Sequence, residues 1–423
     1  MRASLGALML LVAVAGCRRR PPASDAAPAR SSAAPPPPAP PASSSAPSPA
    51  LQPVGDVIAD WRAAEDVKAC QSRSKDLDPG LASGLIAVAG RGKELAVAWF
   101  YNNKVKGEGL VAFSGYDAQL RPLGQPHGLG KGLLARATIV PRKDAWLALW
   151  FDAEGLAYSR ATWAATLPSV EHLRAVTADV APHTAIVRGR SGHLVAVAPL
   201  ALGETAQLGL FTFAPEGDDE PMRALGATHH ARHPEHSALV ETEDGYLVAW
   251  EDGDPGARGV MFTRFDAAGK ELGDGVPLST PGVAASAPAL IDTPRGALAA
   301  WVEGGTIVAR ALDAKGVAVG PARRVAPGER PLLVRTERGA ALVFLHKRGD
   351  VPPHAAAIHV AEDGALPAWG VVLSDAKGKV ALAEPPAAAA LDEGRLAVGF
   401  VYADDMRGAL RVVKVDGCLV DAG

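Results

Sequence analysis

The chain has 423 residues, 48% of them hydrophobic, and its 43 Lys and Arg against 46 Asp and Glu give a net charge of −3. This balance excludes a nucleic-acid binder that works by neutralising phosphates, and the apolar share is large enough for a sizeable core. Aromatic residues make up only 5%, whereas 45 glycines and 35 prolines favour many short elements joined by turns. We therefore expect a globular part built from short elements.

The N-terminus has the pattern of a secretory signal. A basic start with Arg2 precedes an apolar run of 11 residues, Leu5–Ala15, which is about half the length needed to span a bilayer. The following letters, Val14-Ala15-Gly16-Cys17, resemble the lipobox of bacterial lipoproteins. The alternative is an ordinary secretory signal with an incidental cysteine. The resemblance implies a signal peptide over residues 1–16 and acylation of Cys17, so that the mature protein is held to a membrane by its lipid anchor.

Residues 17–53 are expected to form a tether. By analogy with lipoprotein sorting, the arginines after Cys17, with no adjacent aspartate, are compatible with delivery to the outer membrane, on its periplasmic or surface face. Pro21–Pro53 is almost entirely Pro, Ala and Ser, so it cannot bury enough apolar surface to fold, and its prolines favour extended polyproline II. We expect a disordered, semi-rigid spacer between the lipid and the folded part.

Residues 54–423 contain a faint repeat. Its best copies are Asp244–Trp250 and Arg295–Trp301, each a tight-turn pair followed by an apolar strand that ends in an aromatic residue. The template recurs with intervals of 51, 47, 53, 51, 43 and 55 residues. Its seven anchors are Trp99, Trp150, Val197, Trp250, Trp301, Phe344 and Gly399.

A second signature, a strand followed by a turn with aspartate, trails most anchors by roughly 15 to 20 residues; examples are Phe265-Asp266 and Leu312-Asp313. Four short strands per period cannot bury their faces alone, so the copies must pack on one another. We predict an all-β fold, a β-propeller of seven four-stranded blades, because a β-solenoid needs shorter periods and a row of sandwiches needs longer ones. The strand-turn-strand repeats also look distantly similar to the periplasmic propeller of the Tol system, although no diagnostic motif of that family is present.

Two of the three cysteines remain if Cys17 is acylated. Cys70 precedes the first clear strand and Cys418 lies in the last repeat, so a disulfide between them would close the ring in an oxidising compartment. The alternative is two free thiols. Because the chain ends within the last repeat, the segment Asp60–Cys70 is a candidate for the element that completes that blade.

No catalytic motif was found: the chain has no nucleophile elbow, phosphate loop, paired Cys-x-x-Cys or His-Glu-x-x-His, and no cofactor is predicted. A polar cluster occurs between two repeats, and imidazoles at this density are possible zinc or copper ligands, although an exposed loop between blades is the simpler explanation. Its candidate metal ligands are His229, His230, His233 and His236. Nearby, Glu251–Asp254 resembles part of a calcium loop, but an acidic hairpin turn is the simpler interpretation.

A weak candidate for ligand binding comes from the repeat register. Propellers usually bind ligands at one end of the central channel, and counting 14 residues back from each anchor gives the loop that leads into each innermost strand. Basic side chains occupy four of these seven positions, which suggests an anionic ligand or an acidic protein surface. These four are Arg136, His183, His236 and Arg330. The simpler alternative is that they are unrelated loop residues, with an alignment that is off by one or two positions.

From these features we expect a lipid-anchored, extracytoplasmic binding or scaffold module that is not an enzyme and docks an envelope protein or polymer on a propeller face. The alternative is a glycan-acting hydrolase or lyase on the same scaffold. Without the five Arg and one Asp of residues 1–53, the folded part has 38 basic and 45 acidic residues, which again disfavours nucleic acid as a partner. We expect a monomeric propeller.

Overall fold

The computed structural model describes residues 53–420, apart from 56, 78–85, 104–107, 133–136, 164–169, 174–183, 190–192, 203–204, 214–222, 229–230, 232, 255, 375–381, 383 and 405–406. The predicted signal peptide, Cys17 and all of the tether except its last residue lie outside the described residues. Within the described part, no helix is long and apolar enough to cross a membrane.

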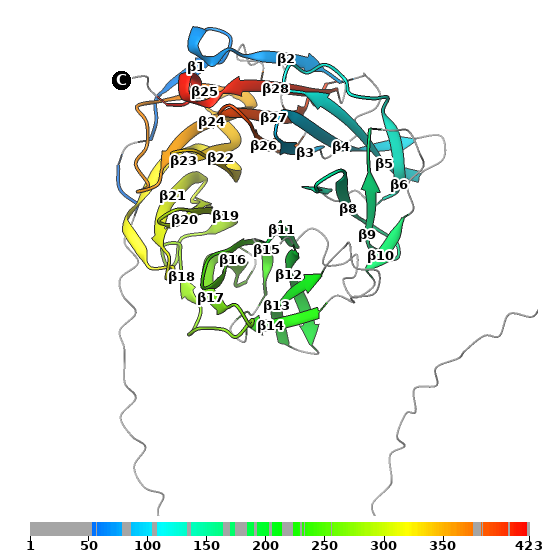
Figure 1. The fold of residues 1–423 in the computed structure, drawn as a ribbon. Helices are drawn as coiled ribbons and strands as arrows, with labels where there is room; N and C mark the ends of the chain where they lie inside the picture. Colours follow the sequence, from blue (N-terminus) through cyan, green and yellow to red (C-terminus); the bar gives the residue numbers. More distant parts are fainter. Residues whose placement is uncertain are drawn as a thin grey trace, which may run out of the picture. The chain divides into compact units, whose positions relative to one another are not determined.

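The folded unit is a β-propeller of seven blades arranged in a ring (Figure 1). The first three blades are separate four-stranded antiparallel sheets. Blade 1 comprises β3 (Ile86–Arg91), β4 (Glu94–Asn103), β5 (Glu108–Asp117) and β6 (His127–Lys131). Blade 2 comprises β7 (Thr138–Pro141), β8 (Trp146–Asp152), β9 (Gly155–Ala161) and β10 (Glu171–Leu173). Blade 3 comprises β11 (Ala185–Arg188), β12 (Leu194–Leu202), β13 (Thr205–Phe213) and β14 (Arg223–Thr228).

Blades 5 and 6 share one long strand, β22 (Ala318–Thr336), which is the outer strand of the first and the inner strand of the second. Blade 4 comprises β15 (Glu235–Glu241), β16 (Gly245–Asp252), β17 (Gly259–Asp266) and β18 (Val276–Pro277). Blade 5 comprises β19 (Ala285–Thr293), β20 (Gly296–Glu303), β21 (Thr306–Asp313) and β22. Blade 6 comprises β22, β23 (Gly339–Arg348), β24 (Val351–Ala361) and β25 (Trp369–Val372).

The ring is closed by an early segment of the chain. Blade 7 comprises β26 (Ala387–Leu391), β27 (Arg395–Val401) and β28 (Gly408–Lys414), and its fourth strand is the N-terminal β2 (Arg73–Asp76), antiparallel to β28. Asp60–Cys70 does not supply this closing strand. It contains β1 (Asp60–Ala63), a parallel fifth strand on blade 6, and the short helix η1 (Lys68–Cys70). The closing strand follows directly after it.

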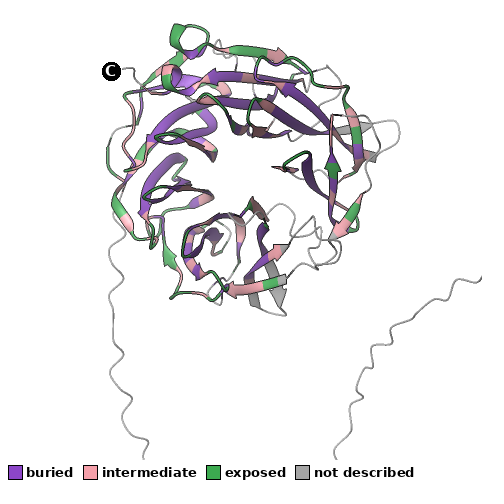
Figure 2. Cartoon of the chain, viewed as in Figure 1, coloured by how far each residue is buried: buried purple, intermediate pink, exposed green. Residues whose placement is uncertain are grey.

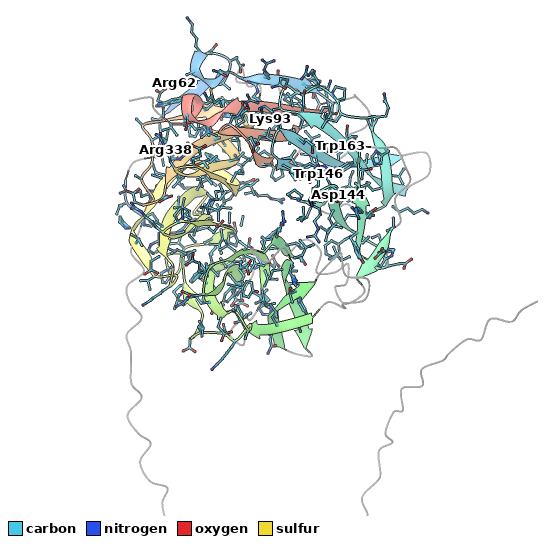
Figure 3. All side chains as sticks on the ribbon, in the orientation of Figure 1. Arg62, Lys93, Asp144, Trp146, Trp163 and Arg338 are labelled. Carbon is cyan, nitrogen blue, oxygen red and sulfur yellow. A yellow bond between two sulfur atoms is a disulfide. The ribbon has the colours of Figure 1, made fainter. Side chains whose placement is uncertain are left out.

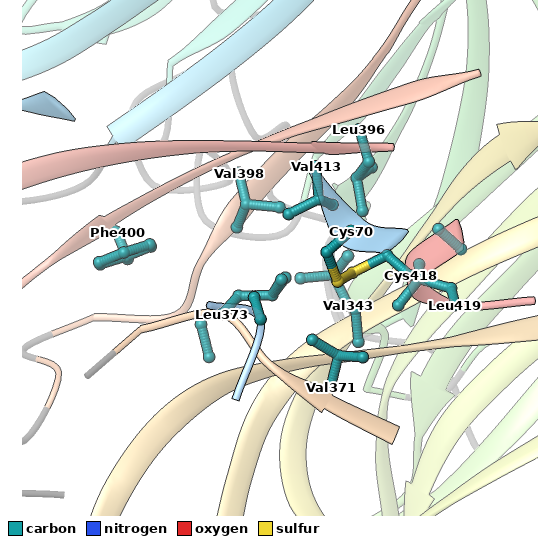
Figure 4. Packing of buried hydrophobic residues seen from close by; sticks show 14 of the residues in the cluster. Cys70, Val343, Val371, Leu373, Leu396, Val398, Phe400, Val413, Cys418 and Leu419 are labelled. Carbon is teal, nitrogen blue, oxygen red and sulfur yellow. A yellow bond between two sulfur atoms is a disulfide. The ribbon is translucent and has the colours of Figure 1, made fainter. Parts of the chain in front are cut away.

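A disulfide between Cys70 and Cys418 joins η1 to the short helix α1 (Val415–Cys418), across a sequence separation of 348 residues. Both cysteines are fully buried in an apolar cluster formed by blades 6 and 7 (Figure 4). The predicted pairing is therefore present. By the chain-entropy model, such a long closed loop raises the free energy of unfolding by at most about 6 kcal/mol.

The core lies between the blades. Seven apolar clusters are present, and each joins two neighbouring blades, from blades 1 and 2 around to blades 7 and 1. The innermost strands also contact one another in sequence, and the last contact, between β26 and β3, completes the circle. In Figure 2 buried residues are concentrated in the interior strands of the blades, and exposed ones lie mainly at turns and along the outer edge. This arrangement confirms that each repeat is buried by its neighbours.

All seven sequence anchors lie on the second strand of their blades. The aspartate signature is a turn device: Oδ1 of Asp117, Asp266 and Asp313 accepts the amide N–H groups two and four residues later, at 2.8–2.9 Å. These side chains fix the turn between the third and fourth strands, so their recurrence has a structural cause. In the last repeat the motif differs, because Asp416 lies in α1.

Candidate functional site

The edge of blade 4 beside the inter-blade loop carries a group of charged side chains next to an innermost strand. Residue Glu235, at the start of β15, pairs with Glu251, near the end of β16, and Glu251 pairs in turn with Val260 of β17. The loop that enters the blade and the hairpin turn after Asp252 therefore share this edge. The acidic segment Glu251–Asp254 ends β16 and enters that turn, as its hairpin interpretation predicted.

A β-bulge aims His236 away from the regular pleat. The pairing of β15 with β16 shifts between Glu235 and Ser237, which leaves His236 outside the ladder. Bulges of this kind redirect a side chain and are common beside functional sites. His236 keeps 42% of its side chain exposed while its Nδ1 lies 2.9 Å from Oε1 of Glu251. The imidazole thus has one nitrogen turned to a carboxylate and a ring that solvent reaches.

Glu251 occupies a position that is apolar in every other blade. It directly follows the anchor Trp250, and its exposed fraction is only 3%. At the same place in the other six blades the chain has buried apolar residues, namely Phe100, Phe151, Ala198, Val302, Leu345 and Phe400. A carboxylate is costly to bury in such a place unless it is paired. Departures of this kind from a repeated structural pattern concentrate at functional sites.

Three groups stabilise the Glu251 carboxylate. His236 contacts Oε1, the amide N–H of Ala287 donates to the same oxygen at 2.6 Å, and Nη1 of Arg258 lies 3.9 Å from Oε2. Ala287 comes from the inner strand of blade 5, where a positive φ of 51° directs its backbone. Non-glycine residues adopt this conformation at a cost, and such strain clusters at binding and catalytic sites.

These contacts set the charge of Glu251. Burial by itself raises the pKa of the carboxyl, but the hydrogen bonds from His236 and Ala287 and the positive charges of His236 and Arg258 outweigh burial and lower the pKa below its usual value. Glu251 is therefore ionised at neutral pH. An ionised carboxylate 2.9 Å from Nδ1 orients the His236 ring and leaves Nε2 as the nitrogen that does not face Glu251.

Arg258 bridges the two glutamates of the cluster. Its two terminal nitrogens hold the two oxygens of Glu235 in a bidentate pair, while Nη1 also faces Glu251. Only 23% of the Arg258 side chain is exposed. A guanidinium held between two carboxylates and next to a histidine offers a fixed positive charge beside a group that can accept a proton.

The predicted metal ligands do not form one group in the described structure. His229 and His230 lie outside the described residues, and His233 faces Asp254, its Nε2 lying 3.9 Å from Oδ1. In the described part of the chain, the potential metal ligands that converge are Glu235, His236 and Glu251, with ligand atoms within 4.8 Å of one another. Because Arg258 already binds both oxygens of Glu235, a cation here would have to displace that guanidinium. The cluster suits proton transfer better than metal binding.

The predicted ligand-binding register is seen in part. Arg136 and His183 lie outside the described residues. His236, Ala287 and Arg330 occupy the bulged segments of the inner strands of three consecutive blades, and Arg330 has a positive φ of 48° like Ala287. The repeat alignment therefore found equivalent positions in these blades. Binding of a ligand by Arg330, Arg136 and His183 remains a prediction.

A second histidine–carboxylate pair lies on blade 2. Nε2 of His172, on the outer strand β10, is 2.7 Å from Oδ2 of Asp152, and the two side chains are 22% and 15% exposed. Here the carboxylate is on the second strand and the histidine on the fourth, away from the innermost strands. This pair provides an internal reference for the blade 4 cluster.

The chain matches no protein-family model and no curated protein. Among solved structures, it is similar to polysaccharide lyase Uly1 at a TM-score of 0.51 and 8% identity, over 80% of this chain and 92% of that one. It is also similar to a GH93 α-L-arabinofuranosidase of Fusarium graminearum (TM-score 0.48, 9% identity, 67% and 94% of the two chains). A third likeness is to a Penicillium chrysogenum α-L-arabinanase (TM-score 0.44, 10% identity, 82% and 100%). At these identities the likeness establishes the propeller fold.

The comparisons correct two expectations drawn from the sequence. The sequence predicts a non-catalytic binding or scaffold module and not an enzyme, but polysaccharide lyase Uly1, with a TM-score of 0.51, is an enzyme on a similar fold. The alternative, a glycan-acting hydrolase or lyase, agrees with that neighbour better. Motif searches missed the Glu251 and Arg258 cluster because its members are brought together by strand pairing. The available signal was the acid at a position that is apolar in the other six repeats.

Proposed function

We propose that this protein is a glycan-acting lyase of the cell envelope, with His236 of blade 4 as its general base. The observation that carries the proposal is the pair formed by His236 and Glu251, in which a buried, ionised carboxylate replaces the apolar residue of the other blades. A carboxylate that orients a histidine is a common arrangement for general-base catalysis.

The chemistry would be β-elimination on an acidic polysaccharide. Nε2 of His236 takes the proton from the carbon next to the sugar carboxylate, the electron pair forms a carbon–carbon double bond, and the bond to the leaving sugar oxygen breaks. That oxygen takes up a proton from water. Arg258, fixed by Glu235, supplies positive charge near the carboxylate of the substrate, where negative charge develops. Glu251 acts as a positioning residue through His236.

The same geometry favours a lyase over a hydrolase. Hydrolases that use two carboxyl groups need one of them protonated as an acid. Here contacts with His236, Ala287 and Arg258 lower the pKa of Glu251 against the effect of burial, and Glu235 is engaged with a guanidinium through both oxygens. Glu251, held ionised, is therefore unsuited to the role of that acid, and both oxygens of Glu235 face the guanidinium.

We place this lyase outside the cytoplasm, anchored by an acylated Cys17 and carried on the tether of residues 17–53, with the outer membrane as the expected location. The lipobox-like letters Val14–Cys17 support the anchor, and the disulfide between Cys70 and Cys418 suits an oxidising compartment. Replacement of Cys17 by Ser should release the protein from the membrane fraction. Unchanged membrane association in that variant would refute the lipid anchor.

Activity is tested by ultraviolet absorbance of the unsaturated sugar that elimination creates, with the mature protein and a panel of uronate-containing polysaccharides. His236→Gln should lower kcat by about 10²- to 10⁴-fold, the range expected for loss of a general base. The matched controls are His172→Gln, which alters the histidine–carboxylate pair of blade 2, and His233→Gln, which alters the exposed neighbour. Both controls should retain activity; an equal loss in the His172 variant would contradict the assignment.

A further inference from the structure

A polar cavity of about 470 Å³ lies where blade 7 meets blade 1. It is at the opposite edge of the blades from His236, because β27 begins and β28 ends beside it, at Arg395 and Lys414. The closing strand and the aspartate turn of blade 1 complete its wall. Its polar lining residues are Gln71, Ser72, Arg73, Gln119, Arg395 and Lys414.

The cavity concentrates positive charge. Arg395 and Lys414 are direct cross-strand partners, and like charges in this relation destabilise a sheet unless an anion lies between or above them. Arg73 adds a third cation from β2. Among the described residues, no acidic side chain lines the cavity, and neither Arg73 nor Lys414 forms an ion pair.

One nearby carboxylate is shared among several cations. Glu393 forms ion pairs with Lys93 at 2.7 Å and with Arg395 at 2.5 Å, and Lys93 lies where blades 1 and 7 meet (Figure 3). The hydrogen bond from Lys93, followed by the charges of Arg395, Lys93 and Lys414, lowers the pKa of this carboxyl. The carboxylate of Glu393 therefore faces three cations. Among the described residues, Arg73 has no carboxylate partner, so the cavity keeps an excess of positive charge.

The neighbouring Arg411 is an example of an arginine whose side chain is held by contacts within the protein. Its Nη1 contacts Glu65 at 2.6 Å and donates to Ser72 at 3.3 Å, which ties the segment before the closing strand to blade 7. Arg73, which pairs with Val412 next to Arg411, and Lys414, at the end of β28, have no such partners within the described part of the chain. This contrast points to a ligand for the latter pair.

We infer that this cavity is a second glycan site, which binds the carboxylate or sulfate group of an acidic sugar through Arg73, Arg395 and Lys414. The volume lies in the range of pockets for small ligands. The amides of Gln71 and Gln119 are donors and acceptors for sugar hydroxyls. A hollow of this size selects a discrete ligand, whereas a membrane surface is bound by protruding basic side chains. The inference does not depend on the chemistry of blade 4.

The test is calorimetric titration of the mature protein, in a His236→Gln background that prevents turnover, with a short oligogalacturonate. The variant Arg73→Ala/Lys414→Ala should bind at least about tenfold more weakly, since each lost hydrogen bond to a charged group is worth about 1.5–3 kcal/mol. The control Lys315→Ala/Arg324→Ala removes the same charge from exposed positions elsewhere and should bind like the background protein.

Three outcomes would overturn the second site: no binding of the oligogalacturonate by the background protein, equal binding by the cavity variant and the control, or loss in the cavity variant of binding to phosphatidylglycerol vesicles but not to the sugar. A neutral oligogalactose of the same length should bind weakly in all variants. Because His236→Gln leaves Arg258 in place, a lyase should show a second binding event at blade 4, and the cavity is then identified by the event that the control double variant keeps and the cavity variant loses. Thermal unfolding of both double variants checks that the closing strand is intact.

Discussion

Blades 4 and 5 both have a buried acid just after the anchor tryptophan, but one residue apart. In blade 5 it is Glu303, two residues after Trp301; its Oε2 accepts the indole N–H at 2.8 Å and the amide of Thr280 at 3.1 Å. In blade 4 it is Glu251, directly after Trp250, and it contacts His236 and Ala287. Because side chains alternate along a strand, a shift of one residue moves the acid to the other face of the blade. Glu303 of blade 5 accepts a hydrogen bond from the loop at Thr280, whereas Glu251 of blade 4 orients His236.

The shift leaves blade 4 with an unmet hydrogen-bond donor. Within the described residues, the buried Nε1 of Trp250 has no partner, whereas Trp301 has Glu303. Asp252 occupies the position of Glu303 in blade 4, but it is one methylene shorter, and its Oδ1 accepts the amide of His233 at 2.8 Å. An unsatisfied buried donor costs about 1–3 kcal/mol. The buried Nε1 of Trp99, the anchor of blade 1, also lacks a partner within the described residues, so the contrast with Trp301 concerns blades 4 and 5 and is not a mark of the site by itself.

The largest effect is expected when the acid of blade 4 is transferred to blade 5. Val302→Glu places a carboxylate at the position of Glu251, but beside blade 5 the chain provides no equivalent of Arg258 in the described structure. The free energy of unfolding should fall by about 3 kcal/mol, since this buried carboxylate lacks equivalents of both His236 and Arg258 and keeps only the bulge of the next blade, at Arg330. Chemical denaturation at pH 7 measures the loss. Stability equal to that of the unaltered protein would show that this position tolerates a carboxylate in any blade.

The next largest effect is expected on kcat, when the negative charge of Glu251 is removed. Glu251→Gln keeps the shape of the side chain but removes the negative charge, so His236 loses its orienting partner. We expect kcat to fall by about hundredfold with a smaller change in KM, because the residue acts through His236 and not on the substrate. A loss confined to KM would contradict this role.

The same variant also tests the pKa of Glu251. Burial raises it, but the contacts with His236, Ala287 and Arg258 lower it below 4.5, the ordinary value. A lowered pKa in the folded state stabilises the fold above the unfolded-state pKa, and this contribution is lost as pH falls through the folded-state value. Glu251→Gln should therefore be less stable at pH 7, and the difference should shrink below about pH 4.5. A difference that persists at acidic pH would exclude this linkage.

The fold was predictable because two features of each repeat, an apolar strand and a turn with aspartate, recur at similar intervals. The tryptophan anchors mark the second strands, and the aspartates have to recur because each one caps the same turn, as Asp266 and Asp313 do. The closing strand could not be read in this way, since Arg73–Asp76 is short and exposed and gains its partner only from β28. The site was harder still. Its members His236, Glu251 and Arg258 meet through a bulge and a hairpin, and the bond from Ala287 depends on packing between blades.

The smallest expected effect comes from giving blade 4 the acid of blade 5. Asp252→Glu adds one methylene at the position equivalent to Glu303, which should let the carboxylate reach Nε1 of Trp250 and satisfy that buried donor. The gain is offset by weaker contact with the amide of His233, which is 64% exposed in its side chain and can bond to water instead. We expect the free energy of unfolding to rise by about 1 kcal/mol, measured by denaturant titration, with activity retained. If Asp252→Glu were destabilising while Glu303→Asp in blade 5 had no effect, the tryptophan–acid bond would not be what separates the two blades. Their difference would then lie only in the contacts of Glu251 with His236 and Arg258.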